Sequence, residues 1–188
     1  MSHKILNEKT LSMLKQKINR GLLPQWVLSD PEMYELELEK IFGRTWQFLA
    51  HESELLEPGS FVTRWIVNDP VLVTKTKSGE IKAFLNSCTH RGTHLCAADY
   101  GKQKTFTCPY HGWTFNLEGK LIGVALGDKV YGEEMKKDEW DLRPIPKIGI
   151  YQGMIFGNLD PNAMPLEDFL GNMKWYFDIL LGRSDGGM

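Results

Sequence analysis

Two short Cys/His pairs, close together in the sequence, constrain the fold of this 188-residue chain more than any other feature. Cys88-Thr-His90 and Cys108-Pro-Tyr-His111 are near-copies of each other, and each lies on a short loop between segments that predict strands. Placed side by side, two such loops would present two thiolates and two imidazoles to one compact group. The fold must therefore bring these two loops together.

The ligand chemistry of the pairs favours an iron–sulfur cluster over zinc. Thiolates suit both, and imidazole also suits both. In a Rieske [2Fe–2S] centre, two histidines replace two cysteines on one iron, which matches two Cys/His pairs. Structural zinc remains the alternative, but its ligands are usually spaced as Cys-x₂₋₄-Cys and His-x₃₋₅-His. The shorter gaps within these pairs are less typical of zinc.

The third cysteine and a further histidine lie in the same stretch of sequence. Cys96 makes the cysteine count odd, and Met1 to Arg20 is polar rather than signal-like, so we expect no disulfide framework and a cytoplasmic protein. We interpret Cys96 as a small buried apolar residue. His94 is expected at the surface or beside the ligands, with a role as ligand in a rearranged site as the alternative.

Composition and charge exclude several classes of protein. Apolar residues make up 42% and charged residues 24% of the chain, as in ordinary globular domains. The formal net charge of −2 gives no general attraction to nucleic acid or to an anionic membrane. No apolar run approaches the roughly 20 residues that span a bilayer. We therefore expect neither a nucleic-acid partner nor a membrane.

The central part of the chain, residues 44–160, predicts a mainly β domain. Short segments rich in β-branched and aromatic residues alternate with turn sequences, which indicates a small antiparallel β-sandwich or barrel. A charged insert at 127–139 interrupts the pattern. The expected strands are 46–50, 61–67, 71–76, 81–85, 113–116, 121–124, 141–150 and 153–158.

Helical segments are expected on both sides of the β domain. Residues 1–43 would form an arm with a short helix, or a loosely docked terminus, followed by an entry helix that starts at Asp30-Pro31 and ends near Gly43. Residues 161–188 would begin a further, truncated segment, helical from Pro165 to Leu181. Four aromatic residues are expected in the core: Trp46, Trp65, Phe84 and Phe106.

The sequence around the pairs resembles the Rieske box of ring-hydroxylating oxygenases, especially the α subunits of bacterial aromatic-ring dioxygenases. The matching motifs are Cys88-Thr-His90-Arg91-Gly92 and Cys108-Pro-Tyr-His111-Gly112-Trp113. The likeness continues outside the box. It includes Leu23-Pro24, Tyr34-Glu-Leu-Glu, Ile41-Phe-Gly-Arg-Thr-Trp46, Leu49-Ala-His51-Glu-Ser-Glu54, Pro58-Gly-Ser-Phe61 and Tyr176-Phe-Asp-Ile-Leu180.

The resemblance implies a set of ligands for one [2Fe–2S] cluster. Cys88 and Cys108 would bind one iron, and His90 and His111 the other. His111 would also pass electrons towards a neighbouring subunit. The supporting residues would be Arg91, Gly92, Gly112 and Trp113, with Trp113 the expected prop of the loops. Tyr110 stands where respiratory Rieske domains have a bridging cysteine, so no disulfide is expected between the loops.

The resemblance also implies a longer parent enzyme. Such oxygenases carry a mononuclear Fe(II) in a second domain, and after His111 this chain has no histidine to bind it. We therefore expect an electron-transfer domain that receives NAD(P)H-derived electrons from a ferredoxin or reductase. It would contact neighbouring α subunits, and a β subunit as a further partner. The parent would cis-dihydroxylate an aromatic substrate with O₂.

Two other functions remain open at the level of sequence. A stand-alone Rieske ferredoxin would carry electrons without belonging to an oxygenase, although such carriers are usually shorter and lack the flanking helices. A structural zinc module would have no redox role and would be colourless. The matches at 41–46 and 49–54 favour the oxygenase.

Overall fold

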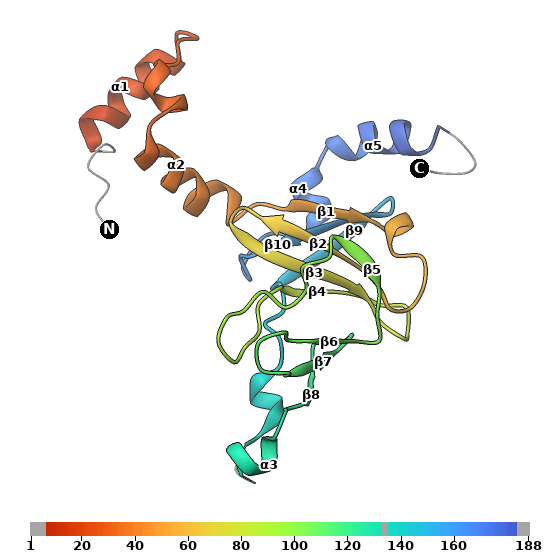
Figure 1. Cartoon of the computed structure of the whole chain (residues 1–188). Helices are drawn as coiled ribbons and strands as arrows, with labels where there is room; N and C mark the ends of the chain where they lie inside the picture. The colour runs from red at the N-terminus through yellow and green to blue at the C-terminus, as the bar shows by residue number, and fades with distance from the viewer. Residues whose placement is uncertain (1–6, 133–134, 184–188) are drawn as a thin grey trace. The chain divides into compact units, whose positions relative to one another are not determined.

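The computed structural model describes residues 7–132 and 135–183. It divides into two compact units, Met1–Arg44 and Thr45–Met188 (Figure 1). None of the helices in these described stretches has the length and apolar character needed to cross a bilayer.

The first unit is helical, as the sequence predicts. Its first helix is capped by Asn7, whose side chain accepts a hydrogen bond from the Thr10 N–H at 2.9 Å. Asp30 caps the entry helix in the same way, and the last turn of that helix widens before it ends at Gly43. The elements are α1 (Glu8–Ile18), η1 (Gln25–Leu28), α2 (Pro31–Glu37) and η2 (Leu38–Phe42).

The second unit contains three antiparallel sheets, which confirms the mainly β fold. The strand orders are β1-β10-β9, β4-β3-β2-β5 and β6-β7-β8. The strands are β1 (Gln47–His51), β2 (Ser60–Ile66), β3 (Asp69–Lys75), β4 (Ile81–Leu85), β5 (Tyr100–Lys102), β6 (Thr105–Thr107), β7 (Thr114–Asn116), β8 (Leu121–Gly123), β9 (Lys147–Tyr151) and β10 (Met154–Asn158).

The four-stranded sheet contributes to core clusters on both of its faces. Alternate residues of a strand point to opposite faces, so β2 sends Phe61 to one core cluster and Val62 to another. The first cluster joins this sheet to β6-β7-β8 through residues such as Phe106, and the second joins it to β1-β10-β9 through residues such as Ile155. Figure 1 shows the strands of the four-stranded sheet between those of the other two.

Three of the four aromatic residues expected in the core are there, and the expectation for Trp65 is wrong. Trp46, Phe84 and Phe106 are buried, whereas Trp65 is 60% exposed. Trp65 shares the face of Phe61 but lies near the other end of β2, where its ring meets the edge of the His94 ring at a centroid distance of 6.2 Å.

Several element boundaries differ from the sequence prediction. β5 and β6 are three residues long and were not expected, because so short a strand shows little periodicity. The equally short β7 and β8 were expected because the turn sequence at 117–120 lies between them. The predicted strand 141–150 is regular from Lys147 onward. The predicted C-terminal helix is divided into α4 (Leu166–Leu170) and α5 (Met173–Leu181) by Gly171, whose φ is +48°.

The charged insert contains ordered turns. Helix α3 (Gly127–Val130) opens it, and η4 (Lys137–Trp140) leads out of it. The side chain of Thr89, in the first Cys/His loop, donates a hydrogen bond to the Trp140 carbonyl at 2.7 Å. The end of the insert is therefore attached to that loop.

The turn between β7 and β8 generates a first prediction. A Cβ on Gly119 would lie 2.3 Å from Cε1 of Phe84, which joins the two sheets, and Gly119 has φ of +79°. Gly119→Ala should therefore destabilise the fold by about 2 kcal/mol or more, through backbone strain and overpacking. Urea unfolding followed by tryptophan fluorescence measures the loss.

Gly79→Ala is the matched control for that substitution. Gly79 also lies in a hairpin turn, with φ of +88°, but a Cβ there would meet nothing within 4 Å. We expect it to cost about 1 kcal/mol, from backbone strain alone. Equal losses of unfolding free energy in the two variants would show that contact with Phe84 adds nothing to the cost of Gly119→Ala.

A second prediction concerns the attachment of α5 to β9. The Tyr151 hydroxyl donates to Asp178 Oδ1 at 2.7 Å, and this hydrogen bond raises the pKa of Tyr151 to about 12. The ordinary value is about 10, so the bond stabilises the fold fully below about pH 10 and less as the pH rises through 12. The melting temperatures of wild type and Tyr151→Phe should therefore differ at pH 9 and converge towards pH 12. A constant difference would contradict this role.

Candidate metal centre

The first Cys/His loop follows β4 and is closed by backbone hydrogen bonds. The Cys88 N–H donates to the Thr93 carbonyl at 2.8 Å, and the Gly92 N–H donates to the Cys88 carbonyl at 2.8 Å. Gly92 has φ of +72°, in the left-handed region that favours glycine. The glycine thus allows the chain to turn back soon after His90.

The second loop joins β6 to β7 and repeats this pattern. The Cys108 N–H donates to the Trp113 carbonyl at 2.7 Å, and the Gly112 N–H donates to the Cys108 carbonyl at 3.0 Å. Gly112 has φ of +71°. Both loops therefore begin with the cysteine, close at the same two positions after it, and hold the histidine in between.

The two cysteines of the loops lie together inside the core. Cys88 and Cys108 are free thiols, each 2% exposed, in the same apolar cluster. Burial raises the pKa of the Cys88 thiol to about 11, backbone N–H groups of the loop oppose the rise, and a hydrogen bond with the Cys108 thiol adds to it. A cation beside these sulfurs would favour their thiolate forms.

The two histidines of the loops also lie together. The rings of His90 and His111 have centroids 4.6 Å apart at an interplanar angle of 67°. Trp113, which is buried, stacks on His90 with centroids 4.6 Å apart and planes within 7°. Burial, then the neighbouring His111, lowers the pKa of His90, so the neutral, ligating form of His90 is favoured.

One atom of His90 is left without a partner. Its Nδ1 is buried and makes no hydrogen bond within the described residues. A buried polar atom of this kind costs free energy unless something binds it. Nδ1 of a neutral imidazole can bind a metal, so this atom fits a cofactor seated between the loops.

The donors fit a cluster that takes one pair of ligands on each side. The two thiols are neighbours, and the two imidazoles are neighbours. Over residues 7–132 and 135–183, no three His, Cys, Asp or Glu side chains gather closely enough to hold a single ion. In a Rieske cluster each iron takes two protein ligands of one kind, and the paired donors match that requirement.

Aromatic residues outside the loops surround His90, and sequence reasoning did not find them. The Tyr131 hydroxyl lies 3.1 Å from His90 Nε2. The ring of Trp140 meets Trp113 edge-on, with centroids 5.3 Å apart and planes at 83°. Tyr131 comes from the charged insert and Trp140 directly follows it, and no spacing in the sequence linked either residue to the loops.

Asn86 is a third residue that sequence reasoning missed. Its side chain is fully buried, donates to the Cys96 carbonyl at 2.7 Å, and accepts from the Cys96 N–H at 2.9 Å. It also lies 2.7 Å from His94 Nε2. An asparagine directly after an apolar strand was the available signal. Asn86 fastens the start of the first loop to its end.

The other predicted residues lie at the edge of the site. Cys96 is buried, as expected, with a thiol directed at a backbone carbonyl. His94 is exposed and bonded to Asn86, so it lies outside the histidine pair formed by His90 and His111. Arg91 is exposed on its loop, and no ion pair of Arg91 is found within the described residues.

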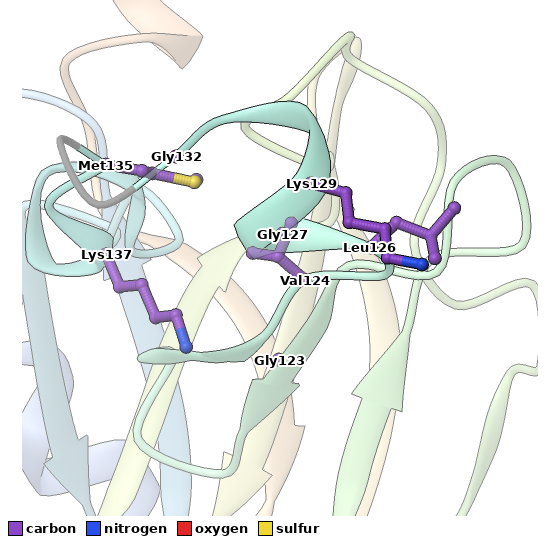
Figure 2. Close-up of a pocket in the computed structure, with 8 residues that line it drawn as sticks. All are labelled: Gly123, Val124, Leu126, Gly127, Lys129, Gly132, Met135 and Lys137. Atoms are coloured by element: carbon purple, nitrogen blue, oxygen red, sulfur yellow. The ribbon is translucent and has the colours of Figure 1, made fainter.

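A hollow of about 540 Å³ lies between the end of β8 and the charged insert (Figure 2). Figure 2 shows Met135 and the lysines Lys129 and Lys137 around it. Its described lining contains none of the four candidate donors. The hollow and the paired donors are therefore different features of the molecule.

Comparisons with known proteins find relatives of this chain. Residues 45–131 match the family described as the Rieske [2Fe-2S] domain. The chain is 40% identical to the biphenyl 2,3-dioxygenase α subunit of Rhodococcus jostii, over 89% of this chain and 36% of that protein. It is 39% identical to the benzene 1,2-dioxygenase α subunit of Pseudomonas putida, over 89% of this chain and 37% of that protein.

The fold agrees with the sequence comparisons. A crystal structure of naphthalene 1,2-dioxygenase from Rhodococcus sp. superposes with a TM-score of 0.91 at 44% identity, covering 96% of this chain and 42% of the other. The chain thus spans well under half the length of the relatives it matches.

A matched pair of cysteine substitutions tests the donor set. Cys88→Ala removes a proposed ligand and should abolish binding of the cluster, whereas Cys96→Ala removes an equally buried thiol and should retain it. Iron content and the visible spectrum of the purified variants measure the difference. Loss of colour in Cys96→Ala would make Cys96 a ligand and overturn the pairing.

Proposed function

We propose that this chain, whose residues 45–131 belong to the Rieske [2Fe-2S] domain family, is the electron-transfer part of an aromatic-ring-hydroxylating dioxygenase α subunit. Cys88 and Cys108 would hold one iron of the cluster, and His90 and His111 the other. When bound, such a cluster accepts and releases one electron at a time. The segregation of donors into a thiol pair and an imidazole pair carries the assignment.

His111 is the proposed exit for electrons. Its ring is half-buried, it adjoins the ring of His90, and exposed Tyr110 lies against it with centroids 3.8 Å apart. This side of the histidine pair is therefore reachable by a partner. We propose that the partner is a neighbouring α subunit, which would hold the mononuclear iron at which O₂ reacts with the aromatic substrate.

Electrons would reach the cluster from a ferredoxin or a reductase that is itself supplied by NAD(P)H. The relatives named above are subunits of dioxygenases, which supports a multi-subunit parent of this kind. A β subunit is a further proposed partner. The free, buried cysteines suit a reducing compartment, and we propose a cytoplasmic location for the protein.

The extent of the similarity favours an oxygenase over a stand-alone carrier. The matches cover 89% and 96% of the chain, so they include the helical segments outside the Rieske domain. A carnitine-oxidising Rieske monooxygenase also superposes, with a TM-score of 0.77 at 34% identity. The higher identity and TM-score of the naphthalene dioxygenase support the dioxygenase class.

The decisive experiment is EPR on the dithionite-reduced protein, with iron and acid-labile sulfide measured on the same sample. About two irons and two sulfides per chain, with a rhombic signal at lower average g than an all-cysteine cluster gives, are expected. A colourless, EPR-silent protein that holds one zinc would overturn the redox assignment.

His111→Ala tests the imidazole side of the site. Because it removes a proposed iron ligand, it should lower iron and sulfide content or change the EPR spectrum of the remaining cluster. His94→Ala is the matched control, since His94 is exposed and bonded to Asn86, and its cluster should be unchanged. Unaltered iron content and spectrum in His111→Ala would exclude His111 as a ligand.

A further inference from the structure

We infer that Tyr131, on the charged insert, is a positioning residue that holds His90 in the form able to bind iron and lowers the reduction potential of the cluster. The inference rests on the proposed function, because it concerns a ligand of the proposed cluster. It assigns a role to a residue that lies outside both Cys/His loops.

The contact between Tyr131 and His90 is direct. The Tyr131 hydroxyl lies 3.1 Å from His90 Nε2, and the two rings meet edge-to-face with centroids 6.2 Å apart and planes at 86°. Tyr131 also meets the edge of Trp113, with centroids 5.9 Å apart and planes at 80°. Trp113 packs against the face of the His90 ring and Tyr131 lies at its edge. Together they fix the orientation of that ring.

This contact determines where His90 carries its proton. A neutral imidazole has one N–H, on either Nδ1 or Nε2. On Nδ1, the proton would be a buried donor without a partner, because Nδ1 makes no hydrogen bond within the described residues. On Nε2, it is donated to the Tyr131 oxygen. The favoured tautomer therefore leaves the lone pair of Nδ1 free for iron.

Tyr131 is itself held in place by its neighbours. Its N–H donates to the Gly127 carbonyl at 2.8 Å at the end of α3. Directly after the insert, Trp140 packs edge-on against Trp113 and accepts the hydrogen bond from Thr89 through its carbonyl. The insert is thus anchored to both loops, which gives the Tyr131 hydroxyl a defined position.

The two histidines therefore have different surroundings. The Nε2 of His90 is occupied by a residue of this chain. No hydrogen bond to the His111 ring is found among the described residues, and exposed Tyr110 lies against that ring. Tyr131 therefore occupies Nε2 of His90, whereas the His111 ring stays available to an electron-accepting partner.

A hydrogen bond from a ligating imidazole to an acceptor raises the basicity of that ligand. A more basic ligand stabilises the oxidised iron relative to the reduced iron. The Tyr131 hydroxyl should therefore lower the reduction potential, and its removal should raise it.

Tyr131→Phe tests this inference in the cluster-containing protein, because it removes the hydroxyl and keeps the ring. We expect unchanged iron and sulfide content, altered EPR g values, and a reduction equilibrium constant about tenfold more favourable, which is 59 mV for one electron. Redox titration with mediators at fixed pH measures the potential. Tyr110→Phe is the matched control. It removes a hydroxyl that makes no hydrogen bond within the described residues, from a ring that lies against His111. It should leave the reduction potential unchanged.

The outcomes distinguish this inference from the proposed function. An intact cluster with an unshifted or lowered potential in Tyr131→Phe would overturn the role of Tyr131 and leave the function standing. A wild-type protein without iron and sulfide would overturn the function itself. If Tyr131→Phe loses its cluster, replacing Tyr131 with fluorotyrosine provides the test, because the fluorotyrosine oxygen is a weaker hydrogen-bond acceptor. A rise in reduction potential smaller than that expected for Tyr131→Phe would support the role of Tyr131. No rise would overturn it.

Discussion

The structure of the site depends on a pair of backbone hydrogen bonds that each Cys/His loop makes to itself. In each loop the cysteine carbonyl accepts a hydrogen bond from the glycine four positions later, and the cysteine N–H donates to the carbonyl of the residue after that glycine. Both glycines have φ in the left-handed region. These bonds fix where the cysteine side chain points. Because the loops extend from two different sheets that share a core, fixing each loop also fixes the distance between the two pairs.

The shared core explains why the thiols and the imidazoles separate. Both cysteines lie at the start of their loops, inside the apolar cluster that joins the sheets. Both histidines are less buried, and His90 contacts Trp113 and Tyr131 of the insert. Burial disfavours the charged thiolate, so the protein alone does not stabilise the ligating form of Cys88. Cluster binding would supply that stabilisation, and assembly of the cluster should therefore be coupled to the stability of this core.

The sequence predicts the parts of the site that depend on local spacing. The Cys/His pairs, the loop glycines and the long strands all have a recognisable pattern over a few residues. Tyr131, Trp140 and Asn86 do not, because their roles arise from contacts between segments that are distant in the sequence. Trp65 shows the same limit, since it shares a face of β2 with buried Phe61 and is nevertheless 60% exposed.

The asymmetry between the histidines follows from the insert rather than from the loops. The loops are near-copies, and by themselves they would present two equivalent imidazoles. The insert returns across one of them and occupies its Nε2 with Tyr131. The His111 imidazole stays accessible beside exposed Tyr110. The two histidines therefore differ because of a residue outside the two motifs. In the proposed function, this difference would direct the departing electron through His111 although the two motifs are near-copies.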